Sequence, residues 1–167
     1  MTRNVSIQPL QTEAFKAYGV VLNLGDSATR VINAGTSQRL DLPGPFALYT
    51  EGGQPVLAVF RARAQAPAGP WHMLERHRLG SQSFVPLAGA RCVALVALGS
   101  NNPDLSTLAA FAAFAVEGNQ GITLHPGTWH HPLLARDDGD FLVIERAGDV
   151  IDCDVVQLET PVYLREG

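Results

Sequence analysis

Charge, cysteine and long apolar runs are all scarce in this sequence, and each scarcity excludes a class of protein. Only 17% of the 167 residues are charged and 46% are hydrophobic, which excludes a disordered chain because disorder requires high charge and low hydrophobicity. Two cysteines are too few for a disulfide framework, so we expect free thiols in a cytoplasmic protein. Apolar runs such as residues 92–98 are far shorter than the ~20 residues of a membrane span.

Basic residues are also few, and they form no cluster. The 12 lysines and arginines are spread along a chain with a net charge of −4. Binding to nucleic acid requires concentrated positive charge, so we expect no nucleic-acid partner and, with no apolar span, no membrane partner. The first residues also lack the apolar core of a signal peptide.

Glycine and proline, by contrast, are abundant, with 16 and 11 residues. They separate short segments rich in Val, Leu, Phe and Ala, a pattern that favours many short strands over long helices. We predict an all-β sandwich or barrel in a single domain over residues 1–167, with minor helices at residues 12–18 and 104–111. The strands are predicted at residues 46–50, 56–63, 84–86, 90–98, 141–147 and 150–158.

Both cysteines lie in predicted strands. Cys92 begins the apolar run, and Cys153 alternates with aspartates while sharing its face with Ile151 and Val155. Alternate residues of a strand share a face, so these apolar residues are predicted to face the core and the aspartates to face solvent. Both cysteines are therefore predicted to be buried thiols rather than nucleophiles.

The histidines fall into two short segments, residues 71–80 and 124–133, with none between them. Histidine titrates near neutral pH and is a common metal ligand. Two tight clusters that also contain Trp, Glu and Arg therefore indicate a functional site about as strongly as a structural one. The five residues are His72, His77, His125, His130 and His131.

The spacing within these segments follows a two-part motif. Glu75 and His77 are two residues apart, so they share a face on a strand, and a turn at residues 79–81 is predicted to bring Gln82 beside them on the neighbouring strand. This is the frame of the cupin motifs G-x5-H-x-H-x3,4-E-x6-G and P-x-G-x2-H-x3-N. Glu75 replaces the first His, Gln82 replaces the Glu, and His130 fits the second motif. We therefore predict a cupin-like, jelly-roll antiparallel β-barrel.

Several longer blocks resemble the ureidoglycolate lyase family of allantoin degradation. They recur in the family's order from about residue 7 to residue 158. The resemblance implies an enzyme that cleaves (S)-ureidoglycolate, a small-molecule substrate, to glyoxylate and urea, and it implies a homodimer. The blocks are residues 74–77, 79–86, 96–99, 103–108, 129–133 and 152–154, together with Asn33 and Arg39.

The implied substrate is a carbinolamine, and its breakdown sets three chemical requirements. A base must accept the hydroxyl proton, an acid or Lewis acid must assist the departing nitrogen, and a cation must hold the carboxylate. We predict Glu75 or His77 as the base and His130 as the group that assists the nitrogen. Arg63 or Arg39 is predicted to bind the carboxylate. The remaining predicted substrate-binding residues are Gln82, Trp129 and His131.

The same residues can also form a metal site. Glu75, His77, Gln82 and His130 offer a carboxylate, two imidazoles and an amide, a set that can bind a divalent transition metal. The resemblance implies nickel as that metal. A metal-free pocket, in which these residues act as acid, base and hydrogen-bond donors, is the alternative.

Two rival functions stand beside the lyase. A ureidoglycolate amidohydrolase releases ammonia, but it needs a water activated by firmly held metal, and this ligand set is thin for two ions. A non-catalytic cupin that binds a small hydroxy acid has no use for Glu75 and His77 side by side. The lyase is therefore the predicted function.

Overall fold

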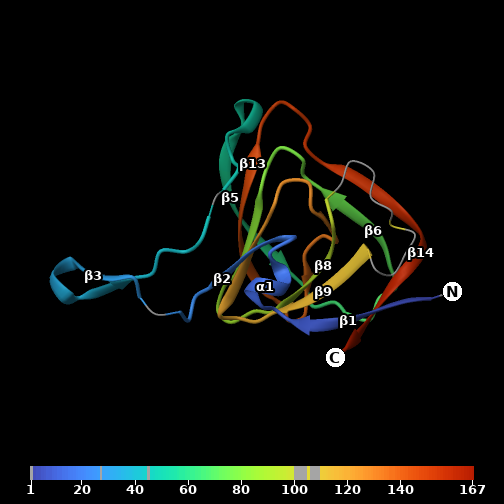
Figure 1. Ribbon diagram of the computed structural model, residues 1–167, viewed down its shortest axis with the longest axis horizontal. Coiled ribbons are helices and arrows are strands. Elements are labelled where there is room, and N and C mark those ends of the chain that lie inside the picture. Colours follow the sequence, from blue (N-terminus) through green and yellow to red (C-terminus); the bar gives the residue numbers. More distant parts are fainter. Residues whose placement is uncertain (1, 27, 45, 100–104, 106–109) are drawn as a thin grey trace.

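The computed structural model describes residues 2–26, 28–44, 46–99, 105 and 110–167 (Figure 1). Sheet A contains β1 (Arg3–Pro9), β6 (Trp71–Arg76), β8 (Cys92–Ala97), β9 (Phe111–Val116), β11 (Trp129–His130), β12 (Leu134–Ala135) and β14 (Asp154–Glu166). Sheet B contains β2 (Gly19–Asn23), β5 (Gln54–Ala62), β7 (Gln82–Pro86), β10 (Gln120–Leu124) and β13 (Gly139–Ala147). The other elements are β3 (Arg30–Ile32), β4 (Ser37–Arg39), helix α1 (Thr12–Phe15) and 3₁₀ turns at Asn33–Gly35 and Thr50–Gly52.

The predicted all-β, cupin-like barrel is confirmed, with one correction to its strand directions. Sheet A has the order β11-β6-β14-β1-β9-β8-β12, and β11 also pairs with β8, so the sheet closes into a ring. The barrel is mixed rather than antiparallel, because β1 pairs in parallel with both β14 and β9. Parallel neighbours need a long connection, and here most of the chain runs between β1 and these two partners.

Strand β8 separates two hydrophobic cores, because both of its faces are buried. Alternate residues point to opposite faces: Val96 packs in the core shared with sheet B, and Leu95 packs in the core inside the ring of sheet A. Figure 1 shows β2, β5 and β13 on one side of β8 and β9, with β6 and β14 on the other. A strand buried on both faces is expected to be continuously apolar, as β8 is.

The predicted strands that correspond to β5, β7, β8 and β13 are confirmed with small shifts of their ends. Residues 46–50 form no strand, because the backbone N–H and C=O of Ala47 bond to Ser81 rather than to a strand ladder. The predicted helix at 12–18 is shorter, since α1 ends at Phe15. The predicted helical segment 104–111 lies mostly outside the described residues, and Phe111 begins β9.

Among the described residues, no helix has the length and apolar character needed to cross a membrane.

The last predicted strand was placed too early, and its faces were assigned the wrong way round. Strand β14 begins at Asp154 and not at residue 150. Ile151 is 88% exposed, Val155 is 53% exposed and Cys153 is exposed, so the prediction of a buried Cys153 is wrong. Cys92 is buried as predicted, and its burial raises the pKa of the thiol to about 12.

The neighbouring aspartates explain this reversal. The Arg76 guanidinium donates to Asp154 Oδ2 at 2.9 Å, and the Leu79 N–H donates to Asp152 Oδ1 at 2.7 Å. These charge-assisted bonds hold both carboxylates against the barrel, and the apolar side chains between them turn outwards.

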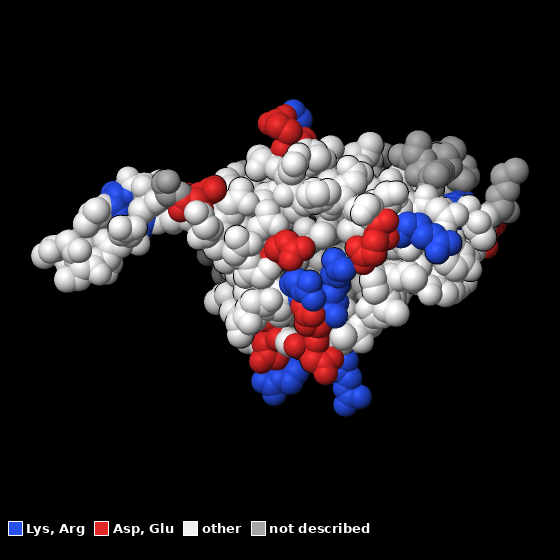
Figure 2. All heavy atoms as spheres, turned by 90° about the horizontal axis from the view of Figure 1, so that it is seen from below, with Lys and Arg blue, Asp and Glu red and all other residues white. Residues whose placement is uncertain are grey.

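A two-stranded arm, β3 paired with β4, projects from the body (Figures 1 and 2). Figure 2 also shows large uncharged areas on the visible face of the body, with acidic and basic side chains next to one another. The arm carries Arg39, whose guanidinium donates to Asp41 at 2.6 Å.

Candidate active site

Strands β6 and β11 bring three predicted site residues together. Glu75 lies on β6 directly opposite His130 on β11, so the two side chains share a face of sheet A. His77 follows Glu75 by two residues, just beyond the end of β6. Glu75 Oε1 lies 3.5 Å from His130 Nε2 and 4.0 Å from His77 Nε2. The structure thus brings together three of the four residues predicted to converge, Glu75, His77 and His130, which are called the triad below.

Backbone carbonyls fix how each imidazole of the triad is turned. His77 Nδ1 donates to the Asp152 carbonyl at 2.5 Å, and His130 Nδ1 donates to the Thr128 carbonyl at 3.0 Å. A carbonyl can only accept, so both Nδ1 atoms carry protons, and in a neutral ring Nε2 then presents a lone pair. Both Nε2 atoms are buried and have no hydrogen-bond partner among the described residues.

The triad therefore places three acceptors against one another. Two Nε2 lone pairs and a carboxylate oxygen lie within 4.8 Å of each other. Ligand atoms that each lie ~2.1 Å from a shared ion are within about 4.2 Å of one another, so a small adjustment suffices. An Nδ1–H bonded to a carbonyl is also the usual outer contact of a metal-bound histidine. The residues fit a divalent cation.

The neighbouring imidazoles act on the carboxylate of the triad. The His130 imidazole beside it holds the pKa of Glu75 below its usual value, and His77 and His131 lower this pKa further when their rings are protonated, against the effect of burial. Burial lowers the pKa of His131. Glu75 is therefore an anion at neutral pH.

The prediction that Gln82 lies on a strand next to β6 is wrong. Gln82 lies across the interior of the barrel, on sheet B. Residues 77–81 cross from sheet A to sheet B instead of forming a hairpin, and Gln82 begins β7 opposite Glu145 of β13. Gln82 and Glu145 lie on the same face as their core neighbours Phe84 and Val143. Gly80 permits the crossing, because a Cβ there would lie 2.7 Å from the Cβ of a packed arginine.

The His77 side of the site, from sheet A, and the Glu145 side, from sheet B, form two walls that meet at a cavity of about 250 Å³. Drug-sized ligands occupy roughly 300–1,000 Å³, so this cavity suits a smaller molecule. Arg146 is the arginine that lines this cavity. Its guanidinium group donates from Nε to the Thr50 carbonyl and from Nη2 to the Glu51 carbonyl. The residues that line the cavity include His77, Ser81, Glu145, Arg146, Asp152 and Cys153.

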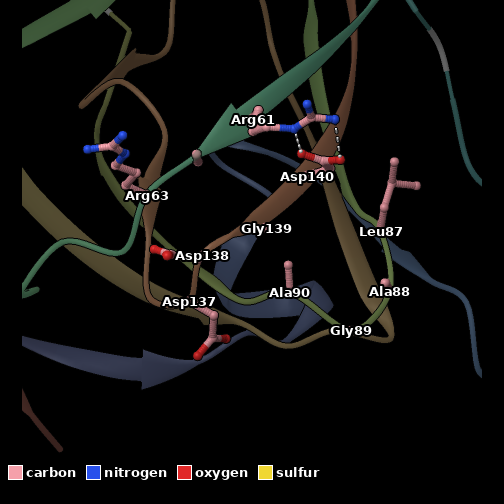
Figure 3. Close-up of a pocket in the computed structure, with 11 residues that line it drawn as sticks. Arg61, Arg63, Leu87, Ala88, Gly89, Ala90, Asp137, Asp138, Gly139 and Asp140 are labelled. Atoms are coloured by element: carbon pink, nitrogen blue, oxygen red, sulfur yellow. Dashed lines mark hydrogen bonds and ion pairs between the residues drawn. The ribbon is translucent and has the colours of Figure 1, made fainter.

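The two arginines predicted to bind the carboxylate lie elsewhere. Arg63 follows the end of β5 beside Arg61, which is paired with Asp140 (Figure 3). Asp140 and Glu145 are five residues apart on β13, or roughly 17 Å along a strand. Arg39 lies on the projecting arm. The local sequence around Arg63 and Arg39 does not show how far each lies from the triad, because that distance depends on the direction in which each strand runs through the barrel.

A larger hollow of about 640 Å³ adjoins Arg63 and not the triad. Figure 3 shows its acidic and basic side chains, with the bidentate pair of Arg61 and Asp140. Asp137 is paired in the same way with Arg91. These exposed pairs satisfy one another, so the smaller cavity beside the triad is the better candidate for an active site.

Trp129 and His131, both predicted to bind substrate, differ in their surroundings. Trp129 packs in the core inside the ring of sheet A, with the Arg76 guanidinium 4.5 Å above its ring. It precedes His130 on β11 and so faces away from the triad. The His131 ring lies edge-on to Trp71 at 4.6 Å, and its Nδ1 donates to the Pro132 carbonyl.

Four residues around the site had no predicted role there: Glu145, Arg146, Asp152 and Cys153. Glu145 follows Phe141 and Val143 at alternate positions of one strand. A carboxylate on the apolar face of a strand is the sequence feature that could have identified Glu145 as a site residue. Asp152 belongs to a block of the family resemblance, but nothing in the sequence indicated that its carbonyl orients His77. Cys153 Sγ lies 3.9 Å from Glu75 Oε2, and partial desolvation of the thiol together with that carboxylate raises the pKa of Cys153.

A cupin-like barrel with this triad beside a small cavity defines a class, the cupin-type enzymes that act on small molecules. A family model described as ureidoglycolate lyase matches residues 2–165. The chain is 38% identical over 156 residues to the ureidoglycolate lyase of Burkholderia cepacia, covering 92% of this chain and 85% of that protein. It is 39% identical over 158 residues to that of Salmonella typhimurium, covering 93% and 95%. The chain belongs to the ureidoglycolate lyase family, and it is a lyase.

Proposed function

We propose that this protein cleaves (S)-ureidoglycolate to glyoxylate and urea, a step of allantoin degradation in purine catabolism. The observation that carries the proposal is the largely enclosed triad, with His130 buried and Glu75 and His77 half-buried, beside a cavity of small-molecule size. The relatives that match over nine-tenths of the chain are named ureidoglycolate lyases. The amidohydrolase and the non-catalytic binding protein are not favoured.

The triad supports a divalent metal ion, and nickel is the metal that we propose. Glu75, His77 and His130 would be its protein ligands, because they bring one carboxylate and two imidazole lone pairs into contact with no donor among them. When bound, the ion supplies Lewis acidity to the oxygen or nitrogen atoms of the substrate. This supports a ligand role for the triad over the alternative of three proton-transfer groups.

The walls of the cavity supply the other interactions that the substrate requires. Arg146 is held rigidly by two backbone carbonyls, and its remaining N–H groups are suited to the substrate carboxylate. Asp152 keeps His77 in the tautomer whose Nε2 faces the site. Glu145 lies in the opposite wall, and Gln82 donates to its carboxylate from the neighbouring strand β7.

A product assay tests this function. Purified protein incubated with (S)-ureidoglycolate and nickel is expected to release glyoxylate and urea in equal amounts, because the C–N bond breaks without hydrolysis of the ureido group. Urea and ammonia are measured separately, with the (R)-enantiomer as the control. Release of ammonia in place of urea would instead establish the amidohydrolase, and tight binding without turnover would establish the binding protein.

A further inference from the structure

The proposed reaction moves a proton from the substrate hydroxyl to its ureido nitrogen, and a triad that holds a cation has no free base for this transfer. We propose that Glu145 is the catalytic residue that carries the proton, with Gln82 as the residue that positions it. This inference rests on the proposed function and adds to it a base on the opposite wall of the site.

Glu145 stands where such a base is needed. It lies on the inward face of β13, two residues beyond the core residue Val143, and it lines the same cavity as His77. Strand β13 is paired on both sides, with β7 and β5, so the carboxylate is carried by a rigid part of the sheet. The triad lies on sheet A and Glu145 on sheet B, which places the two kinds of group on different sides of a ligand in the cavity.

Gln82 holds one oxygen of this carboxylate and leaves the other available. Gln82 Nε2 donates to Glu145 Oε2 at 2.8 Å, and Gln82 is only 5% exposed. Among the described residues, Glu145 Oε1 has no hydrogen-bond donor. Gln82 Oε1 is also buried without a partner, and an orphaned buried acceptor costs stability. An N–H donor of the ligand would satisfy it, as the ureido group of the substrate can.

The other carboxylates beside the cavity are already engaged. Asp152 Oδ1 accepts from the Leu79 N–H. Asp154 accepts from the guanidinium groups of Arg76 and Arg78. Glu75 belongs to the triad. Glu145 is thus the carboxylate of this site that is bound by a neutral amide alone among the described residues.

The step balances without any further reactant. Glu145 accepts the hydroxyl proton, the C–O bond becomes the C=O of glyoxylate, and the C–N bond breaks with its electron pair going to nitrogen. The same carboxyl group then returns the proton to that nitrogen, which leaves as urea. A positioned group of this kind contributes about 10²–10⁴ in rate.

The test compares Glu145→Gln with wild type and with Glu159→Gln, a matched change at an exposed carboxylate of β14. Glu145→Gln is expected to lower kcat for urea release by roughly 10²–10⁴, to change KM by less than about threefold and to leave the bound nickel per chain unchanged. Glu159→Gln should match wild type. Glu145→Ala supplies a readout that a structural role would not move: added formate should restore part of its kcat, but not that of Glu145→Gln, whose amide still fills the space.

Near-normal kcat in Glu145→Gln, while wild type releases urea, would overturn this inference and leave the proposed function standing. Loss of nickel or of folded protein in Glu145→Gln would assign Glu145 a structural role and would overturn it as well. A wild-type protein that releases no urea would overturn both.

Discussion

Replacing His130 with alanine is expected to lower kcat for urea release by at least about 10²-fold, because losing even an outer partner of a metal ligand costs roughly 10–100-fold in metal affinity or activity. His130 is 3% exposed, and its Nε2 is one of the three acceptors of the triad. Without it, Glu75 on β6 and His77 just after that strand offer a cation only two ligands. The bound nickel per chain should therefore fall together with kcat. Steady-state kinetics and elemental analysis of the same preparation measure both effects.

His72→Ala is the matched control for this variant, because His72 is an exposed histidine on β6, the strand that carries Glu75. It should retain the kcat and the nickel content of wild type. A folded His130→Ala protein with near-normal kcat would exclude His130 from the mechanism.

The largest expected loss of stability comes from Phe114→Ala. Phe114 is 2% exposed in the core between β9 and sheet B, and its ring meets Phe15 edge-on at 5.2 Å and lies 5.9 Å from Tyr18. Truncation of a buried phenylalanine loses transfer free energy and leaves a cavity, at a cost of about 3–5 kcal/mol. Domains are stable by only about 5–15 kcal/mol, so urea denaturation should show a midpoint far below that of wild type.

Ile151→Ala is the control for this loss, because Ile151 is a large apolar residue that is 88% exposed. Its free energy of unfolding should stay within about 0.5 kcal/mol of wild type. A change of less than about 1 kcal/mol in Phe114→Ala would show that this core can close around the missing ring.

The part of the site predictable from the sequence is the part set by local geometry. Glu75 and His77 share a face because strands alternate, and the motif spacing related His130 to them before any fold was known. Strand β8 could also be predicted from its apolar run, because a strand buried on both faces is continuously apolar and does not alternate between apolar and polar residues. Strand β9 was missed, since its alanines have weak strand preference.

What could not be predicted depends on contacts between distant segments. The sequence does not reveal that residues 77–81 cross between sheets, and that crossing decides whether Gln82 lies beside Glu75 or opposite it. The outward turn of Cys153 follows from Asp152 and Asp154 finding donors on other segments. In the same way, no local pattern places Arg63 at the far end of β13 or Arg39 on the projecting arm.

The central claim is that the three acceptors of Glu75, His77 and His130 hold the cation at which ureidoglycolate is cleaved. The most direct test removes all metal with a chelator, verifies its absence by elemental analysis, and then titrates nickel while urea release is followed. We predict no urea from the metal-free protein and a rate that rises until one ion is bound per chain. Full turnover by protein proven to be free of metal would contradict the claim.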